Sequence, residues 1–433
     1  MRTFIVIWLG QMVSTIGSRM SIFAITIWAW ELTGSATALA LVGFFFFVPS
    51  ILSALLAGVI VDRLNRKFLM VLSDTGTALS TSVLLLLALI GNLQIWHIYA
   101  IAALIGFFSQ IQMLAYQVSM SLIVPQQHYT RAISMGSVVD YGGEIIAPAL
   151  AGSLYPFIGL VGILLIDLAT FGVAIATVIC VHIPQPSHTD AFNHNRGKLW
   201  QELGFGFSYI FTRNSLLALL VATSLFWFAH DLGESIYNPM ILARTGGNAG
   251  ILGSVTSAAG FGGVTGAVIV SIWGGPKRRI SGLFLGMMGA GVSKTIFGLG
   301  WMPSIWIPAQ FCSSLNFPLL SSSNTTIWLA KSEPSVQGRV FAASSLIKQV
   351  VAAISTLIAG PLADHLFEPA MMSGGILAPL LGWIFGTEPG AGMALLYVIT
   401  SICLLLVGIG GYAFATLRNV DKIVPNPDKP LRS

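Results

Sequence analysis

Of the ionisable side chains inside long apolar runs of this 433-residue chain, six are candidates for proton transfer and charge balance. Four are carboxylates, which can take up and release a proton, and two are cations, which can act as their counter-ions. The carboxylates are Asp140, Glu144, Asp231 and Glu234, and the cations are Arg19 and Lys348. Ionisable groups at bilayer depth are rare and costly, so each is a functional candidate. The sequence therefore offers a set of proton-coupling carboxylates.

The spacing of these acids groups them in pairs. Asp140 and Glu144 are one helical turn apart and face the same way, and Glu234 lies one turn from Asp231. In a low-dielectric cavity, desolvation and mutual repulsion favour proton uptake by such acids. A second interpretation stays open, in which buried ion pairs only neutralise one another and fix helix register.

The apolar runs that hold these residues are long enough to cross a membrane. Apolar residues make up 55% of the chain and charged residues 9%, and the mean hydropathy is +0.83. A soluble domain carries about 25% charged residues, and a spanning helix needs about 20 apolar residues. We expect an all-α membrane protein of twelve transmembrane helices. The predicted spans are near 4–30, 37–61, 68–90, 95–118, 132–154, 158–182, 215–237, 248–273, 280–300, 304–330, 340–363 and 392–416.

The basic residues predict the orientation of the chain. Most of the 21 Lys and Arg residues fall at the two termini or in alternate loops, and the opposite loops hold Arg244 alone. The positive-inside rule then puts both termini in the cytoplasm. The net charge of +5 does not indicate a nucleic-acid partner, because the cations lie in short loops between apolar runs. We expect a monomer in a bacterial inner membrane, surrounded by the lipid bilayer.

The chain divides near its midpoint. Segment 183–213 breaks the apolar pattern with prolines, histidines and polar residues, and reads as a cytoplasmic linker. Setting Arg131 against Arg339 aligns two similar stretches, which indicates two related six-helix repeats around a central pathway. The predicted parts are a bundle at 1–182, the linker at 183–213, a bundle at 214–418 and a cytoplasmic tail at 419–433.

Several patterns resemble catalytic or metal motifs only superficially. Ser345 and Lys348 have Ser-x-x-Lys spacing but lie in a predicted span without partner motifs. Stretch 289–295 lacks the glycine that precedes lysine in a phosphate loop. The histidines of the linker and the three cysteines have no metal-ligand spacing. We expect no enzymatic activity, no cofactor and no metal.

A loop motif carries a family resemblance. Its residues, spaced as Gly-x-x-x-Asp-Arg-x-x-Arg-Lys, are Gly58, Asp62, Arg63, Arg66 and Lys67. They resemble the signature loop between the second and third helices of the major facilitator superfamily, and this resemblance implies a gating loop. That family usually has Gly at the position of Asn65, and Asn also tolerates a left-handed turn.

Later stretches resemble the macrolide-efflux and enterobactin-exporter branch of that family. They include Val124-Pro125, Gly338-Arg339, Gly360-Pro361 and 386–392, where Glu388 replaces a usual glycine. The resemblance implies a secondary active transporter that exports a drug-like or secondary-metabolite molecule by proton antiport with alternating access. A siderophore exporter and a proton-coupled uptake permease are alternatives of the same fold. A non-transporting membrane receptor is an alternative of another class.

The resemblance also implies places for the charged residues. The first and seventh spans line the central cavity in this family, so we expect Arg19 and Asp231 to enter it from opposite halves. The internal repeat matches Asp140 with Lys348. We expect Asp74 to join the loop cluster, and Lys294 to snorkel or form a local pair. The Gly-rich motif of antiporters in the fifth span is matched in part by Gly142, Gly143, Pro148 and Gly152, which predict a flexible, closely packed helix.

Overall fold

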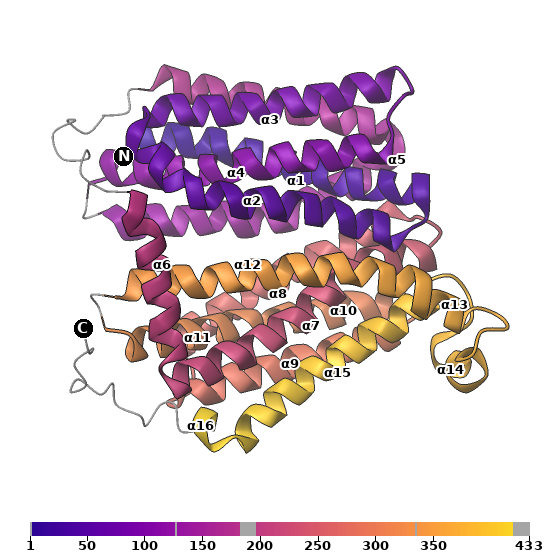
Figure 1. Ribbon diagram of the computed structural model, residues 1–433. Helices are drawn as coiled ribbons and strands as arrows, with labels where there is room; N and C mark the ends of the chain where they lie inside the picture. The colour runs from indigo at the N-terminus through magenta and orange to yellow at the C-terminus, as the bar shows by residue number, and fades with distance from the viewer. Residues whose placement is uncertain (1, 126–127, 182–195, 334–335, 419–433) are drawn as a thin grey trace.

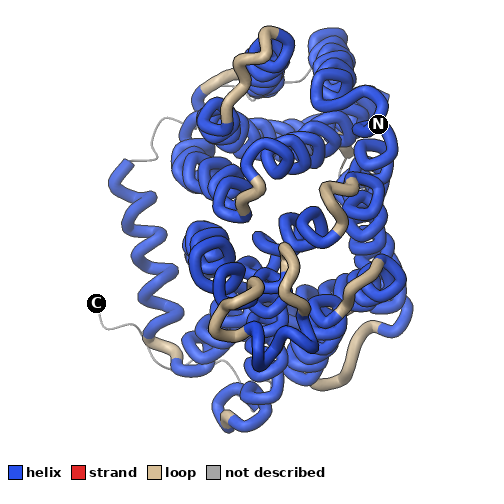
Figure 2. The backbone as a smooth tube through the Cα atoms, turned by 90° about the vertical axis from the view of Figure 1, so that its right-hand side faces the viewer, coloured by secondary structure: helices blue, strands red, loops and turns tan. Residues whose placement is uncertain are grey.

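The computed structural model describes residues 2–125, 128–181, 196–333 and 336–418, and within these ranges all regular structure is helical (Figure 2). The first half holds α1 (Arg2–Thr33), α2 (Ala36–Arg63), α3 (Arg66–Leu89), α4 (Ile95–Ile123) and α5 (Tyr129–Cys180). After α6 (Arg196–Phe211) come α7 (Asn214–Arg244), α8 (Ala249–Trp273), α9 (Arg279–Leu299), α10 (Pro303–Leu315), α11 (Phe317–Lys331) and α12 (Gln337–Pro361). The chain ends with η3 (Leu362–Phe367), α13 (Glu368–Met371), α14 (Ala378–Phe385), α15 (Ala391–Ala413) and α16 (Ala415–Arg418).

Helix α5 is two crossings joined by a sharp turn. Its 52 residues would span about 78 Å as one straight helix, far more than a bilayer core of about 30 Å. Gly159 breaks the helix with φ 60° and ψ −168°, a conformation open to glycine. Accordingly, near the start of α1, Trp8 Nε1 donates to Met135 O at 2.9 Å and Gly10 packs against Thr177. The two limbs of α5 therefore run back along each other.

The number of crossings fits the twelve predicted spans. Ten helices in the described ranges are long and apolar enough to cross a membrane. Counting both limbs of α5 adds one crossing. Helices α10 and α11 follow each other through Asn316 and together form another. The protein is thus an all-α, multi-pass membrane protein.

The helices form two groups that lie one above the other (Figure 1). Helices α1–α5 make the upper group, and α7–α12 with α15 make the lower group. Helix α1 begins and α16 ends at one end of the molecule, which we call the termini end; α13 and α14 lie at the opposite end. Helix α6 occupies part of the predicted linker and packs through Gly206 against Arg339 of α12.

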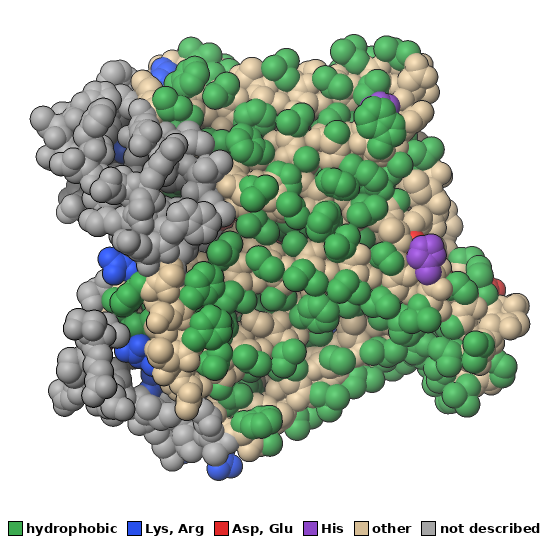
Figure 3. Space-filling view, in the orientation of Figure 1, with side chains coloured by type: hydrophobic (Ala, Val, Ile, Leu, Met, Phe, Trp, Pro, Cys, Tyr) green, Lys and Arg blue, Asp and Glu red, His purple; other side chains and the backbone are tan. Residues whose placement is uncertain are grey.

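The flank of the bundle matches a lipid environment. Apolar side chains cover the face seen in Figure 3, and large apolar residues such as Phe157 and Ile272 are 86% and 84% exposed. Such continuous apolar surface is stable only against lipid. On the same face, the described Lys and Arg side chains gather at the termini end (Figure 3).

Small residues bring the two groups together between α5 and α8. A Cβ added at Gly253 would lie 2.6 Å from Pro148 O, and one added at Gly152 would lie 2.8 Å from Ala249 O. Ser257 Oγ donates to Ile145 O at 2.9 Å across the same contact. Three of the predicted span-5 residues therefore belong to close packing, since Gly143 also lies against the Arg19 side chain.

A carboxylate joins the groups at the opposite end. Asp364 of η3 accepts hydrogen bonds from the backbone N–H groups of Ala36 and Thr37, at 3.0 and 2.8 Å, and from Ser35 Oγ at 2.6 Å. These N–H groups begin α2 and have no partner inside that helix. Asp364 thus caps α2 from the other half and joins the two groups at the opposite end.

The signature loop is described in part. Only the helical backbone of Gly58, Asp62 and Arg63 is described, and Lys67 Nζ donates to the carbonyls of Ile179 and Val181 at 2.6 and 2.7 Å. Asn65 does not use its tolerance of a left-handed turn, because it has φ −60°. Instead its side chain accepts from Phe68 N at 3.2 Å and caps α3.

Asp74 is also placed differently from the prediction. It is 5% exposed and accepts a hydrogen bond from Gln11 Nε2 at 3.0 Å. Gln11 belongs to α1, so Asp74 joins α3 to α1 inside the first half. A buried carboxylate needs such partners more than a loop carboxylate does.

Candidate functional site

Two cavities lie in the interior of the bundle. The apolar cavity has a volume of about 380 Å³ and is bounded by α1–α4 on one side and by α7 and α12 on the other. Its lining is almost entirely aliphatic and aromatic in the first half, with Asp231 and Glu234 as its ionisable residues. Representative lining residues are Ile25, Val42, Phe46, Phe47, Ile101, Ser235, Asn238 and Thr356.

The polar cavity has a volume of about 450 Å³ and lies between α5 and the helices α7–α11. Both halves contribute charge to it, Glu144 from α5 and Glu234 with Lys294 from the second half. Its remaining lining residues include Tyr141, Trp227, His230, Gln310, Ser313, Ser314, Phe317 and Ser321. Its chemistry therefore differs from that of the apolar cavity.

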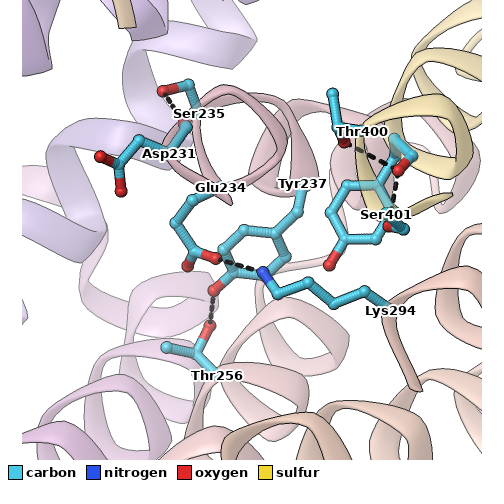
Figure 4. Close-up of polar contacts among 9 residues, drawn as sticks. Asp231, Glu234, Ser235, Tyr237, Thr256, Lys294, Thr400 and Ser401 are labelled. Atoms are coloured by element: carbon cyan, nitrogen blue, oxygen red, sulfur yellow. Dashed lines mark hydrogen bonds and ion pairs between the residues drawn. The ribbon is translucent and has the colours of Figure 1, made fainter. Parts of the chain in front are cut away.

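Glu234 lines both cavities. Helix α7 contributes to the lining of both cavities, and Asp231 and Glu234 lie three residues apart on it, so their side chains leave neighbouring positions of one face. Figure 4 shows Glu234 pointing toward Lys294 and Asp231 pointing away from it. Among the residues that the structure describes, Glu234 is thus the one that lines both cavities.

Lys294 of α9 forms an ion pair with this carboxylate. Its Nζ lies 3.0 Å from Glu234 Oε2, and the two side chains are 3% and 43% exposed (Figure 4). The ammonium group also lies 5.5 Å from the centre of the Tyr397 ring. Both contacts stabilise a cation that has lost nearly all of its water. The local pair foreseen for Lys294 is therefore present, with a candidate proton carrier as its partner.

A second ion pair joins α1 to α5. Arg19 Nη1 lies 3.4 Å from Glu144 Oε1, and these side chains are 32% and 52% exposed. The Arg19 side chain lies against Gly143, where an added Cβ would be 2.9 Å from Arg19 Cδ. Gly143 therefore provides the room in which Arg19 reaches Glu144.

Three of the six predicted residues are not among those that line the two cavities. Arg19 is one of them: it was expected in the central cavity with Asp231, but its side chain pairs with Glu144 of α5. Asp140 is exposed and acts electrostatically on Tyr116 of α4, whereas Glu144 faces the polar cavity. Lys348 is half-buried on α12. Neither Asp140 nor Lys348 is among the residues that line the two cavities, so the structure does not bring this matched pair together with Glu234.

The sequence signals for the polar cavity were present but weak. Lys294 is the one Lys or Arg inside its apolar run, and Gln310 is one of three amide side chains in its own, with Asn316 and Asn324. Both marked a polar environment, but helix rotation decides which neighbour each one meets. Within the described ranges, no cluster of three or more His, Cys, Asp and Glu side chains has the geometry of a metal site.

Comparison with known proteins agrees with this architecture. The sequence model of the Major Facilitator Superfamily matches residues 7–356. "Macrolide efflux protein A" of Streptococcus pyogenes is 26% identical over 366 residues, which cover 84% of this chain and 90% of that protein. "Multidrug efflux pump Tap" of Mycolicibacterium fortuitum is 21% identical over 416 residues, 94% of each chain.

Solved structures show the same fold at low sequence identity. A bacterial homologue of the human lysosomal transporter Spinster, solved inward-facing and unoccupied, has a TM-score of 0.72 at 14% identity and covers 98% of this chain and 99% of its own. A bacterial homologue of the iron transporter ferroportin, also inward-facing, has a TM-score of 0.69 at 16% identity, with the same coverage.

Proposed function

Because the chain belongs to the major facilitator superfamily and is a transport protein rather than an enzyme, we propose that it exports an amphipathic, drug-like molecule in exchange for protons. The similarity to a macrolide efflux protein and to a multidrug efflux pump supports export over uptake and supports macrolides as the first compounds to try. The apolar cavity supports a substrate with a large apolar part.

We place the protein in a bacterial inner membrane with the termini end in the cytoplasm. On the face shown in Figure 3, the described Lys and Arg side chains gather at that end, as the positive-inside rule requires. Asp364 and the α5–α8 contact then close the outer side. In this arrangement, the substrate enters from the cytoplasm, and export requires these outer contacts to break.

The position of Glu234 between the two cavities carries the proposal. Deprotonated Glu234 is held by Lys294, and a proton that binds Glu234 cancels this attraction. The pair joins α7 to α9, so its loss changes how two helices of the second half hold each other. A proton and a substrate in the apolar cavity thus act on the same side chain, which is the requirement for coupling.

The other charged residues take supporting roles in this proposal. Asp231 is a second carboxylate on the apolar cavity and is a second candidate carrier. Glu144, with Arg19 as its counter-ion, is a candidate on the polar cavity. Asp140 and Lys348 remain candidates of lower rank because they line neither space. Residues Gly58, Asp62, Arg63, Arg66 and Lys67 form the proposed gating loop.

Transport by purified protein in liposomes tests the proposal. We expect a radiolabelled macrolide to accumulate on one side when a pH gradient is imposed, and not when the gradient is removed. Glu234→Gln is expected to abolish gradient-driven accumulation. The control is Glu31→Gln, an exposed carboxylate that accepts a hydrogen bond from Tyr155 and lines neither cavity. Gradient-driven accumulation by Glu234→Gln at the wild-type rate would refute the coupling role.

A further inference from the structure

Helix α14, at the end of the molecule opposite the termini end, is apolar on every side (Figure 1). It consists of seven apolar residues and one glycine, and at about 12 Å it is too short to cross a bilayer. A helix that is apolar all round is normally buried in a core or in lipid. One face of α14 is buried in the protein, since Leu381 and Ile384 pack against the core of the bundle and Phe385 is 4% exposed.

The other face of α14 is exposed. Leu380 and Trp383, three residues apart, are 68% and 82% exposed, and Ile376, just before the helix, is 91% exposed. Trp301, in the turn between α9 and α10, adds a ring that is 48% exposed. We call these four residues the α14 patch. Figure 3 shows apolar side chains gathered at the corner where Figure 1 places α14, next to the apolar flank of the lower group.

Hydrogen bonds fix the level of α14 relative to the membrane spans. Arg244, the last residue of α7, donates from Nη2 to Phe385 O at 2.9 Å and from Nη1 to Gly300 O at 2.7 Å. Trp301 Nε1 donates to Ile384 O at 3.0 Å. The last turn of α14 is thereby held beside the ends of α7 and α9, and α15 begins shortly after it. Spans end where the chain leaves the hydrocarbon layer, so α14 lies at the membrane boundary.

The composition of the α14 patch fits this level of a bilayer. Trp is enriched at membrane interfaces, where its ring meets the acyl chains and its N–H stays among polar groups. An interfacial helix buries its apolar face about 5–10 Å into this layer. The chain from Asp364 to Glu388 contains no Lys or Arg, and therefore lacks the cations that attract anionic lipids.

We propose that α14 is an interfacial anchor, whose patch binds neutral lipids in the headgroup and upper acyl layer of the leaflet at this end of the molecule. The hydrogen bonds from Arg244 and Trp301 make the anchor part of the second half and fix it to α7, the helix that carries Glu234. The second half thus keeps one end in the lipid surface. This inference depends on the lipid-facing flank, and not on the proposed substrate or on proton coupling.

Quenching of a fluorophore on the α14 patch tests this in nanodiscs of phosphatidylcholine. The full chain with Cys180→Ala, Cys312→Ala and Cys403→Ala receives one new cysteine, Leu380→Cys or Trp383→Cys, which is labelled with NBD. Two positions are used so that the result does not depend on one substitution. We expect a lipid with a nitroxide near its headgroup to quench both labels about threefold more than a lipid with a nitroxide at the chain end, and aqueous iodide to quench them weakly.

Two control positions bracket the expected depth. Glu388→Cys, an exposed position between α14 and α15, is expected to be quenched by iodide and little by either lipid. Leu79→Cys, 61% exposed near the middle of α3, is expected to be quenched most by the chain-end nitroxide. Exchange of part of the phosphatidylcholine for phosphatidylglycerol is expected to leave quenching of the patch labels unchanged.

Three results would overturn the proposal. The first is iodide quenching of both patch labels as strong as that of the Glu388→Cys label, without quenching by the headgroup nitroxide. The second is protection from both quenchers in discs that hold two copies and not in discs that hold one, which would assign the exposed face to a second copy of the chain. The third is lipid quenching that requires phosphatidylglycerol, which would replace neutral lipid by an anionic one.

Discussion

The Glu234–Lys294 and Glu144–Arg19 ion pairs join the same kinds of groups but differ in their surroundings. Lys294 is 3% exposed and lies 3.0 Å from Glu234, whereas Arg19 is 32% exposed and lies 3.4 Å from Glu144. A desolvated cation depends on its partner, while a hydrated one is stabilised by water as well. Glu234 therefore determines whether a buried cation has a counter-ion, whereas Glu144 pairs with a cation that water also stabilises.

Removing the carboxylate of each pair in turn is expected to give the largest difference in the free energy of unfolding between the two pairs. Glu234→Gln leaves the Lys294 charge buried without a counter-ion and is expected to lower the free energy of unfolding by about 3 kcal/mol. Glu144→Gln is expected to cost less than about 1 kcal/mol, because Arg19 keeps contact with water. Denaturant unfolding of the detergent-purified variants measures both. Equal losses would show that burial does not distinguish the pairs.

Removal of both partners sharpens the same contrast. The double variant Glu234→Gln, Lys294→Met replaces the buried charge by an apolar side chain, and is expected to recover about 2 kcal/mol relative to Glu234→Gln. Proton-driven export is expected to stay absent. A double variant as unstable as Glu234→Gln would mean that the pair is not the source of the loss.

The matching change in the first half is expected to have a smaller effect. Arg19→Met removes a half-exposed cation and is expected to alter stability by about 0.5 kcal/mol, with Glu144 left in contact with water. Lys294→Met removes the cation of the other pair and is the matching variant in the second half, where Glu234 is 43% exposed. A loss above about 2 kcal/mol for Arg19→Met would contradict the ranking of the two pairs.

The smallest expected effect concerns the room around Arg19. Gly143→Ala places a Cβ 2.9 Å from Arg19 Cδ, so the flexible side chain must shift and the pair with Glu144 is weakened, by about 0.5 kcal/mol. Gly142→Ala is the control, since no atom lies within 4 Å of its Cβ position. Identical unfolding of the two variants would show that Gly143 has no role in positioning Arg19.

The sequence allowed prediction of the crossings and of the charged candidates, because lipid requires long apolar runs and makes every ionisable exception conspicuous. It did not allow prediction of the neighbour of each charge. Asp140 and Glu144 differ by about 40° around one helix, and only Glu144 faces the polar cavity. The partner of Lys294 and the capping role of Asp364 depend on tertiary packing, which spacing along the chain does not encode. The cap that Asn65 provides is local, since it bonds to Phe68 three residues on.

Substrate-driven proton movement tests the central role of Glu234 most directly. Liposomes that hold a pH-sensitive dye and the purified protein receive an outward macrolide gradient, with the membrane potential clamped. We predict that the wild type and Glu31→Gln move protons into the lumen as the macrolide leaves. Glu234→Gln is predicted to release macrolide without any change in lumen pH. Proton movement by Glu234→Gln at the wild-type rate would contradict the account.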